Sequence, residues 1–318
     1  MPIVHSCKTL VCGNLTSTLI PFLLSAGLKI LLYLLATVLL GATLAPWIFW
    51  AGQYASNFRF LGFLATTDFQ RFFDRSILIS ALFLLLPAFR WIGTKRFSNL
   101  GLTRNFCRME HLVGGFLVSS GTIIAFGGVL LALGGLELKS PIPWHLLLRV
   151  ALTAISVAII EEILFRGAIL GLLRQSFAPV PAAVFTSALF SIIHFLKPAR
   201  EEMSAVHWYS GFEILPHVFW QFSEPLLIVG GFVTIGILGL ILAHATMRTS
   251  SLWLAIGIHS GVVFGKMGLN KLTRRLEDMR PWFGGDVTVG IGSIAALLFL
   301  WFMIWFIFLR GQPDSTAA

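Results

Sequence analysis

Long apolar runs separated by short polar stretches fill the chain between residues 27 and 309. A helix needs about 20 apolar residues to cross the roughly 30 Å hydrocarbon core of a bilayer, and the runs approach that length. No run alternates between apolar and polar positions, and backbone groups in lipid must be satisfied within the spanning element, so helices are expected. The pattern predicts an all-α, polytopic transmembrane helical bundle of about eight spans. The expected spans are 27–50, 76–93, 112–135, 145–170, 179–197, 224–246, 251–267 and 287–309.

Composition agrees with a membrane protein. Hydrophobic residues make up 57% of the chain and charged residues only 12%, about half of the roughly 25% typical of soluble domains. The formal net charge of +9 could indicate a nucleic-acid binder. The basic residues stand between apolar runs instead, where they contact lipid headgroups. We therefore expect the lipid bilayer as a partner, no nucleic acid, and a multi-pass location in a prokaryotic plasma membrane.

Two basic connections leave the orientation of the bundle open. One lies at residues 95–108 and the other at residues 266–280. With eight spans these connections fall on opposite sides of the membrane, so an excess of Lys and Arg in cytoplasmic loops cannot favour both.

The connection at residues 197–223 is amphipathic, with aromatic residues among acids. This composition predicts a helix that lies at the membrane interface. A lid over a site in the bundle is the alternative.

Glycines recur along two of the expected spans. Gly114, Gly121, Gly128 and Gly135 are spaced by seven residues in the third span, and Gly236, Gly239 and Ala243 follow a similar pattern in the sixth. Small residues on one face let another helix approach closely, so both sets are predicted to be packing seams, with a flexible hinge as the alternative.

Acidic residues inside the fourth span are the first candidate for chemistry. Ionisable groups at membrane depth cost about 2.5–3.5 kcal/mol each and need a reason to be there. Glu162 and Arg166 are four residues apart and can pair on one helix face, whereas Glu161 points away from Arg166 by about 140°. The spacing predicts a supporting Glu162–Arg166 ion pair and a free Glu161 carboxylate. A purely interfacial charge network is the alternative.

Two histidines on later spans are candidate partners for Glu161. His194 follows Phe190 by one turn in the fifth span, and His259 lies in the seventh. A carboxylate and an imidazole can together deprotonate a water, and a second imidazole can stabilise the oxyanion that forms. Alternatively, Glu161, His194 and His259 could hold a catalytic Zn²⁺, so the need for a cofactor stays open.

These motifs resemble a known family. The chain carries Glu161-Glu162-xxx-Arg166, then Phe190-xxx-His194, then His259, each on its own expected span. In order and spacing they are similar to the motifs of the CAAX-processing and bacteriocin-processing proteases, which include the type II CAAX prenyl endopeptidases. The resemblance covers about residues 145–267.

The resemblance implies a glutamate-dependent intramembrane endopeptidase acting on a membrane-associated protein or peptide, with or without a prenyl group. Glu161 and His194 would activate water and His259 would hold the oxyanion. Glu162, Arg166 and Phe190 would support them. The family usually has Asn or Asp four residues after the last histidine, where this chain has Val263.

The expected organisation is three parts. Residues 1–111 would hold N-terminal spans and a basic loop, residues 112–267 a catalytic helical core, and residues 268–318 a basic loop, the last span and a short tail. Two other functions stay open. One is a catalytically weak or inactive membrane protein of the same fold, in an immunity or scaffold role, which Val263 favours. The other is a transporter.

Other intramembrane protease chemistries lack their motifs. The sequence contains neither His-Glu-x-x-His, which binds zinc, nor Gly-x-Gly-Asp. Ser260-Gly261 lacks the Gly-x-Ser-Gly arrangement of the serine enzymes. The Ser260 hydroxyl or a backbone N–H could still replace the missing Asn or Asp donor.

Overall fold

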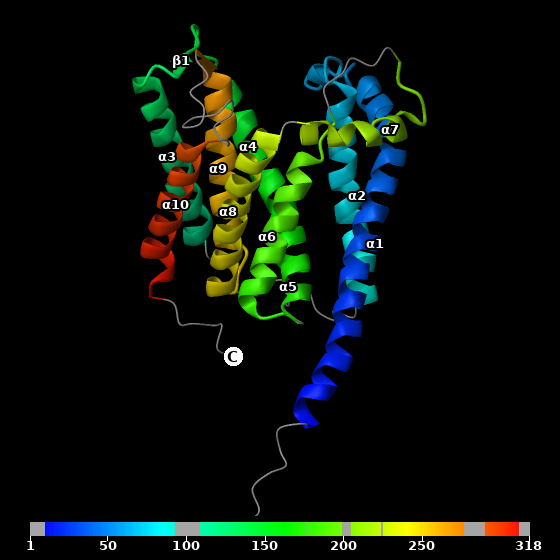
Figure 1. Cartoon of the computed structure of the whole chain (residues 1–318). Helices are drawn as coiled ribbons and strands as arrows, with labels where there is room; N and C mark the ends of the chain where they lie inside the picture. The colour runs from blue at the N-terminus through cyan, green and yellow to red at the C-terminus, as the bar shows by residue number, and fades with distance from the viewer. Residues whose placement is uncertain are drawn as a thin grey trace, which may run out of the picture.

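The computed structural model is a bundle of long helices that run alternately up and down (Figure 1). It describes residues 10–92, 109–175, 177–198, 205–223, 225–276 and 290–311. The long helices are α1 (Leu10–Ala55), α2 (Phe69–Ile92), α3 (Met109–Ala132), α4 (Leu146–Glu162), α6 (Pro179–Phe195), α8 (Pro225–Thr249), α9 (Trp253–Leu272) and α10 (Ile291–Ile304). The shorter elements are the 3₁₀ turn η1 (Gly62–Leu64), the π-helical turn η3 (Ile163–Ile169), α5 (Leu170–Leu173), α7 (Ser210–Glu213), the 3₁₀ segment η4 (Leu215–Ser223) and the π-helical turn η5 (Trp305–Leu309).

The all-α membrane fold is confirmed, and each expected span coincides with a long helix or with a helix and the turn that extends it. Four of them are long and apolar enough to cross a membrane by length and composition: Gly27–Ala55, Met109–Ala132, Ile228–Thr249 and Ile291–Leu309. The other helices are shorter or carry more polar groups, so the count of about eight spans stays a prediction.

Large apolar side chains cover the outside of the bundle. Phe83 on α2, Leu117 on α3 and Phe302 on α10 are more than half exposed. In water such a surface would aggregate, whereas in a bilayer it meets lipid tails. The exposed apolar surface is therefore that of an integral membrane protein.

A short strand pair closes one end of the bundle, where β1 (Leu136–Leu138) pairs antiparallel with β2 (Thr273–Arg275). The Arg274 Nε donates a hydrogen bond of 2.7 Å to Glu137 Oε2 on an exposed surface. This hydrogen bond holds the pKa of Glu137 below its usual value and raises the pKa of Arg274. The pair joins the end of α3 to the end of α9.

The seam between α3 and α9 depends on glycines other than those the seven-residue repeat predicted. A Cβ on Gly257 would collide with the Leu112 carbonyl of α3, and a Cβ on Gly261 would collide with Ser119. By contrast, a Cβ on Gly121 would meet nothing within 4 Å, and the same holds for Gly128. The predicted seam at Gly121 and Gly128 is therefore wrong, because these residues face away from the neighbouring helices.

The amphipathic connection lies across the end of the bundle as α7 and η4 (Figure 1). Its buried residues Ile214 and Val218 pack with Ala42 and Phe69 from α1 and α2. Its large aromatic side chains are exposed: Trp208, Tyr209, Phe212, Phe219, Trp220 and Phe222. This arrangement, with one face anchored and aromatic rings outward, is that of an interfacial segment.

Both basic connections of the sequence fall mostly outside the described residues. Residues 95–108 lie there entirely, as do residues 277–280 of the second connection. Their flanking helix ends, Ile92 with Met109 and Leu276 with Gly290, lie at opposite ends of the bundle (Figure 1).

Candidate active site

The two glutamates end α4, and the chain continues directly into the π-helical turn η3, which carries Arg166. The Arg166 Nη1 donates a hydrogen bond of 2.9 Å to Glu162 Oε1, and neither side chain has any exposed surface. The ion pair that the four-residue spacing predicts is therefore present. An ion pair in such a dry place is stable only when further hydrogen bonds satisfy it.

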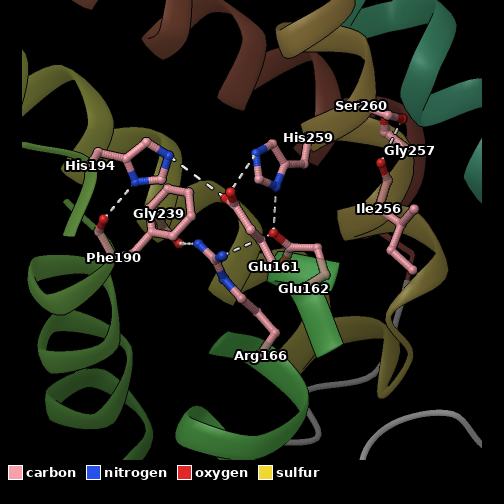
Figure 2. A network of polar contacts seen from close by, with 10 residues as sticks. All are labelled: Glu161, Glu162, Arg166, Phe190, His194, Gly239, Ile256, Gly257, His259 and Ser260. Carbon is pink, nitrogen blue, oxygen red and sulfur yellow. Dashed lines mark hydrogen bonds and ion pairs between the residues drawn. The ribbon is translucent and has the colours of Figure 1, made fainter. Parts of the chain in front are cut away.

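His259 supplies one of those hydrogen bonds from α9. Its Nδ1 lies 2.7 Å from Glu162 Oε1, the oxygen that also binds Arg166 (Figure 2). The ring is 2% exposed. Since Gly257 and Gly261 press the opposite face of α9 against α3, His259 is directed toward α4.

His194 reaches the same place from the end of α6. Its Nδ1 lies 2.8 Å from the Phe190 carbonyl oxygen one turn earlier, and the ring is 23% exposed. The Phe190 ring packs at 4.4 Å from the His194 ring and at 5.7 Å, edge to face, from His259. Phe190 therefore separates and orients the two imidazoles.

Glu161 lies between the two rings. Its Oε2 is 3.7 Å from the Nε2 of His194 and 3.7 Å from the Nε2 of His259. This oxygen is buried and accepts no hydrogen bond from the residues that the structure describes, while the side chain is 14% exposed. The predicted acid and both predicted histidines therefore meet at one point, with Glu161 and His194 on its more open side.

The partners of the rings decide where their protons lie. A carbonyl and an ionised carboxylate can only accept, so the Nδ1 of His194 and the Nδ1 of His259 each carry the proton. In the neutral rings each Nε2 is then an acceptor directed at the Glu161 carboxylate. The centre of the site is thus rich in acceptors and suited to a group with two O–H donors, such as water.

The contacts of Arg166 include one that no sequence motif pointed to. Its Nη2 donates a hydrogen bond of 3.2 Å to the carbonyl oxygen of Gly239 on α8. Its guanidinium also lies over the Phe190 ring, 4.4 Å from the centroid. Every residue has a backbone carbonyl, so the sequence cannot indicate which one binds a side chain. For this reason the sequence predicts Gly239 only as a packing residue.

The zinc alternative lacks a prepared ligand set. Among the described residues, no three His, Cys, Asp or Glu side chains are arranged to hold a metal ion. The candidate set is Glu161 with His194 and His259. The Glu161 Oε2 lies 3.7 Å from each Nε2 atom, and the lone pairs of both rings are directed at this oxygen. A carboxylate oxygen and two imidazole lone pairs are also zinc ligands, so the zinc alternative stays a prediction.

The suggested substitute donor Ser260 points away from the site. Its Oγ donates to the Ile256 carbonyl at 2.7 Å and to the Gly257 carbonyl at 3.0 Å, within its own helix (Figure 2). The expectation that Ser260 could replace the Asn or Asp donor is therefore wrong. Val263 lies on α9 one turn beyond His259 and brings no polar group to this face.

Comparison with known proteins gives a family match for the part of the chain that holds these residues. Residues 143–265 match the family of Rce1-like type II CAAX prenyl endopeptidases. This match supports the resemblance of the segment to the CAAX-processing and bacteriocin-processing proteases. No curated protein and no solved structure matches the chain.

The matched protease segment runs from just before α4 to the second half of α9. It contains the whole polar cluster, whereas α1, α2, α3 and α10 lie outside it. The match supports a function of the CAAX-type intramembrane protease kind. The three-part division at residues 111 and 267 stays a prediction, although its expected core encloses the matched segment.

Proposed function

We propose that this protein is an endopeptidase that hydrolyses a peptide bond of a membrane-associated, prenylated protein with a water activated by Glu161 and His194. The observation that carries the proposal is the Glu161 Oε2, which lies 3.7 Å from two imidazole Nε2 atoms and has no hydrogen-bond donor among the described residues. A separation beyond 3.5 Å invites a bridging water. A water about 2.8 Å from each of these atoms would donate to the carboxylate and to one ring.

In the proposed reaction the water oxygen attacks the carbonyl carbon of the scissile bond. Glu161 takes one water proton, with His194 holding the other side of the water. As the C–N bond breaks, the same proton passes to the leaving nitrogen, which departs as an amine. Water is consumed, and the products are a carboxylic acid and an amine, which exchange the second water proton to give a carboxylate and an ammonium.

His259 would support the oxyanion in its protonated form, in which Nε2 becomes a donor. The Glu162 carboxylate at 2.7 Å from Nδ1 stabilises that imidazolium. Arg166 in turn pairs with Glu162 at 2.9 Å and holds its carboxylate beside His259. The buried pair thus acts on the reaction through His259.

The experiment that tests the proposal uses the purified full chain in proteoliposomes with a fluorogenic farnesylated peptide that ends in a CAAX sequence. Glu161→Ala and His194→Ala should each lower cleavage by at least about 10²-fold, the usual contribution of general base catalysis. The matched controls are Glu137→Ala and His217→Ala, an acid and a histidine that are exposed and make none of the contacts described for the cluster.

Both controls should retain the activity of the parent protein. Cleavage that survives in Glu161→Ala or in His194→Ala, at equal amounts of folded protein, removes the mechanism. A peptide without the farnesyl group, run in parallel, tests whether the lipid is recognised.

A second candidate function is a non-catalytic role for the same fold. Val263 favours it, because one missing oxyanion donor typically costs about 10²–10³ in rate. If the parent protein cleaves neither peptide while the biological effect survives Glu161→Ala, this second candidate is preferred.

A further inference from the structure

The Arg166 guanidinium is fully buried, and its direction depends on fixed partners. Besides Glu162 and the Phe190 ring, it binds the Gly239 carbonyl of α8 through Nη2 at 3.2 Å. Figure 2 shows Gly239 on the side of Arg166 opposite His259. The helix α8 therefore reaches the site through a backbone atom, without an ionisable side chain of its own there.

The close approach of α8 depends on Gly239 having no side chain. A Cβ at this position would lie 2.8 Å from the Ser187 Cβ and 3.0 Å from the Ser187 Cα on α6. Atoms so near a backbone cannot turn aside as the tip of a long side chain can. Any larger residue at position 239 must push α8 away from α6.

Gly236, one turn earlier on α8, offers the opposite case. A Cβ there would meet nothing within 4 Å. Both glycines lie on α8, but of the two only Gly239 is in close contact with α6. Sequence spacing alone does not separate them.

We propose that Gly239 is a positioning residue of the catalytic site. Its missing side chain lets α8 press against Ser187, and this contact places the Gly239 carbonyl on Arg166, which then directs Glu162 toward His259. The hydrogen bond is already 3.2 Å long, so a shift of a few tenths of an ångström takes it beyond normal bonding distance. The catalytic part of this inference rests on the proposed function, whereas the geometric part does not.

The test compares Gly239→Ala with Gly236→Ala and adds relief variants at Ser187. The Ser187 Oγ is buried without a hydrogen-bond partner among the described residues, so its loss removes no bond. In Gly239→Ala/Ser187→Gly the 2.8 Å collision with Cβ disappears and only the tight 3.0 Å approach to Cα remains. In Gly239→Ala/Ser187→Ala the Cβ stays, and so does the collision.

The readout that does not depend on activity is the ring nitrogen spectrum of His259. Nuclear magnetic resonance of protein with isotope-labelled histidine, with His259→Ala to assign the signal, reports its Nδ1 contact with Glu162. Gly239→Ala should move this signal and Gly236→Ala should leave it in place. Addition of Ser187→Gly should return it most of the way, and Ser187→Ala should not.

Cleavage of the farnesylated peptide gives the second readout. Gly239→Ala should lower kcat on the order of 10-fold to 100-fold with little change in KM, since misplacement by a fraction of an ångström to one ångström has such effects. The same Ser187→Gly change should restore kcat. A loss of kcat at an unchanged amount of folded protein and an unchanged unfolding temperature separates a positioning role from a general loss of stability.

The two proposals fail in different ways. An unmoved His259 signal in folded Gly239→Ala, or equal rescue by Ser187→Gly and Ser187→Ala, overturns the positioning role. A parent protein that cleaves no peptide, while the His259 signal still follows the Gly239 and Ser187 changes, overturns the protease mechanism and leaves the positioning contact standing.

Discussion

Glu162 has no exposed surface, so its charge depends wholly on Arg166 and His259. A charge in that position is expensive when its partner is lost, because the remaining ion cannot be hydrated. Glu161 differs at the same helix end: it is partly exposed, and its Oε2 has no donor among the described residues. Neighbouring residues of one type thus have different surroundings: Glu162 is paired, whereas Glu161 is open to the proposed water.

The buried pair predicts a particular pattern of stability. Glu162→Gln should lower the free energy of unfolding by about 3–5 kcal/mol, since it leaves the Arg166 charge without its nearest partner. Glu162→Gln/Arg166→Met, which removes both charges, should cost clearly less than the two single changes together. Unfolding by SDS from detergent micelles measures these differences.

An exposed ion pair provides the control for that series. Asp68 and Arg71 are 3.6 Å apart and about half exposed, so Asp68→Asn should change the unfolding free energy by less than about 1 kcal/mol. Equal costs for Asp68→Asn and Glu162→Gln would contradict the view that burial makes the Glu162–Arg166 pair important.

At the scale of elements, the site depends on how closely α9 lies against α3. The helix has glycines at positions 257 and 261 on the face toward α3 and His259 on the face toward α4. A side chain added on the face toward α3 would push α9 away from α3 and so shift His259 relative to α4. The glycines of GIHSG thus serve helix approach, and the serine between them binds its own helix backbone.

Glycine substitutions on facing helices should therefore have opposite effects. Gly261→Ala should destabilise the protein by about 1–3 kcal/mol, as overpacking usually does, because its Cβ would collide with Ser119. Gly121→Ala on α3 has open space and should be neutral or stabilising by up to about 1 kcal/mol, through the better helix propensity of alanine. Thermal unfolding in detergent compares them, and a similar loss in both would refute the seam described for α3 and α9.

At the scale of the whole molecule, the alternating helices define two faces (Figure 1). The connection with α7 and η4 lies at one end, and the end of α10 lies at the other. Between them the chain passes through α8, α9 and α10. If each of these helices crosses the bilayer, the two ends are on opposite sides of the membrane.

Cysteine labelling tests this arrangement. In a variant whose native cysteines are serine, His217→Cys and Gly311→Cys should react with a membrane-impermeant maleimide from opposite sides of sealed vesicles. Phe58→Cys, in the connection after α1, should react from the same side as His217→Cys. Labelling of positions 217 and 311 from one side would mean that one of the three helices does not cross, and would reduce the count of about eight spans.

Much of this protein follows from local order along the chain. Apolar runs of spanning length without alternation indicate helices, since a helix satisfies its backbone groups within the spanning segment. A four-residue spacing determines that Glu162 can pair with Arg166. The candidate residues Glu161, His194 and His259 are also visible as polar groups in apolar surroundings. These features depend only on neighbours within one helix.

The tertiary structure decided what depends on contacts between helices. It placed the Nδ1 of His259 on Glu162 and the Gly239 carbonyl on Arg166, and it showed that Gly121 faces open space while Gly261 faces α3. A glycine has no side chain to reveal which face is covered, and a backbone carbonyl is the same at every residue. Which of them matters is determined only when another helix packs against it.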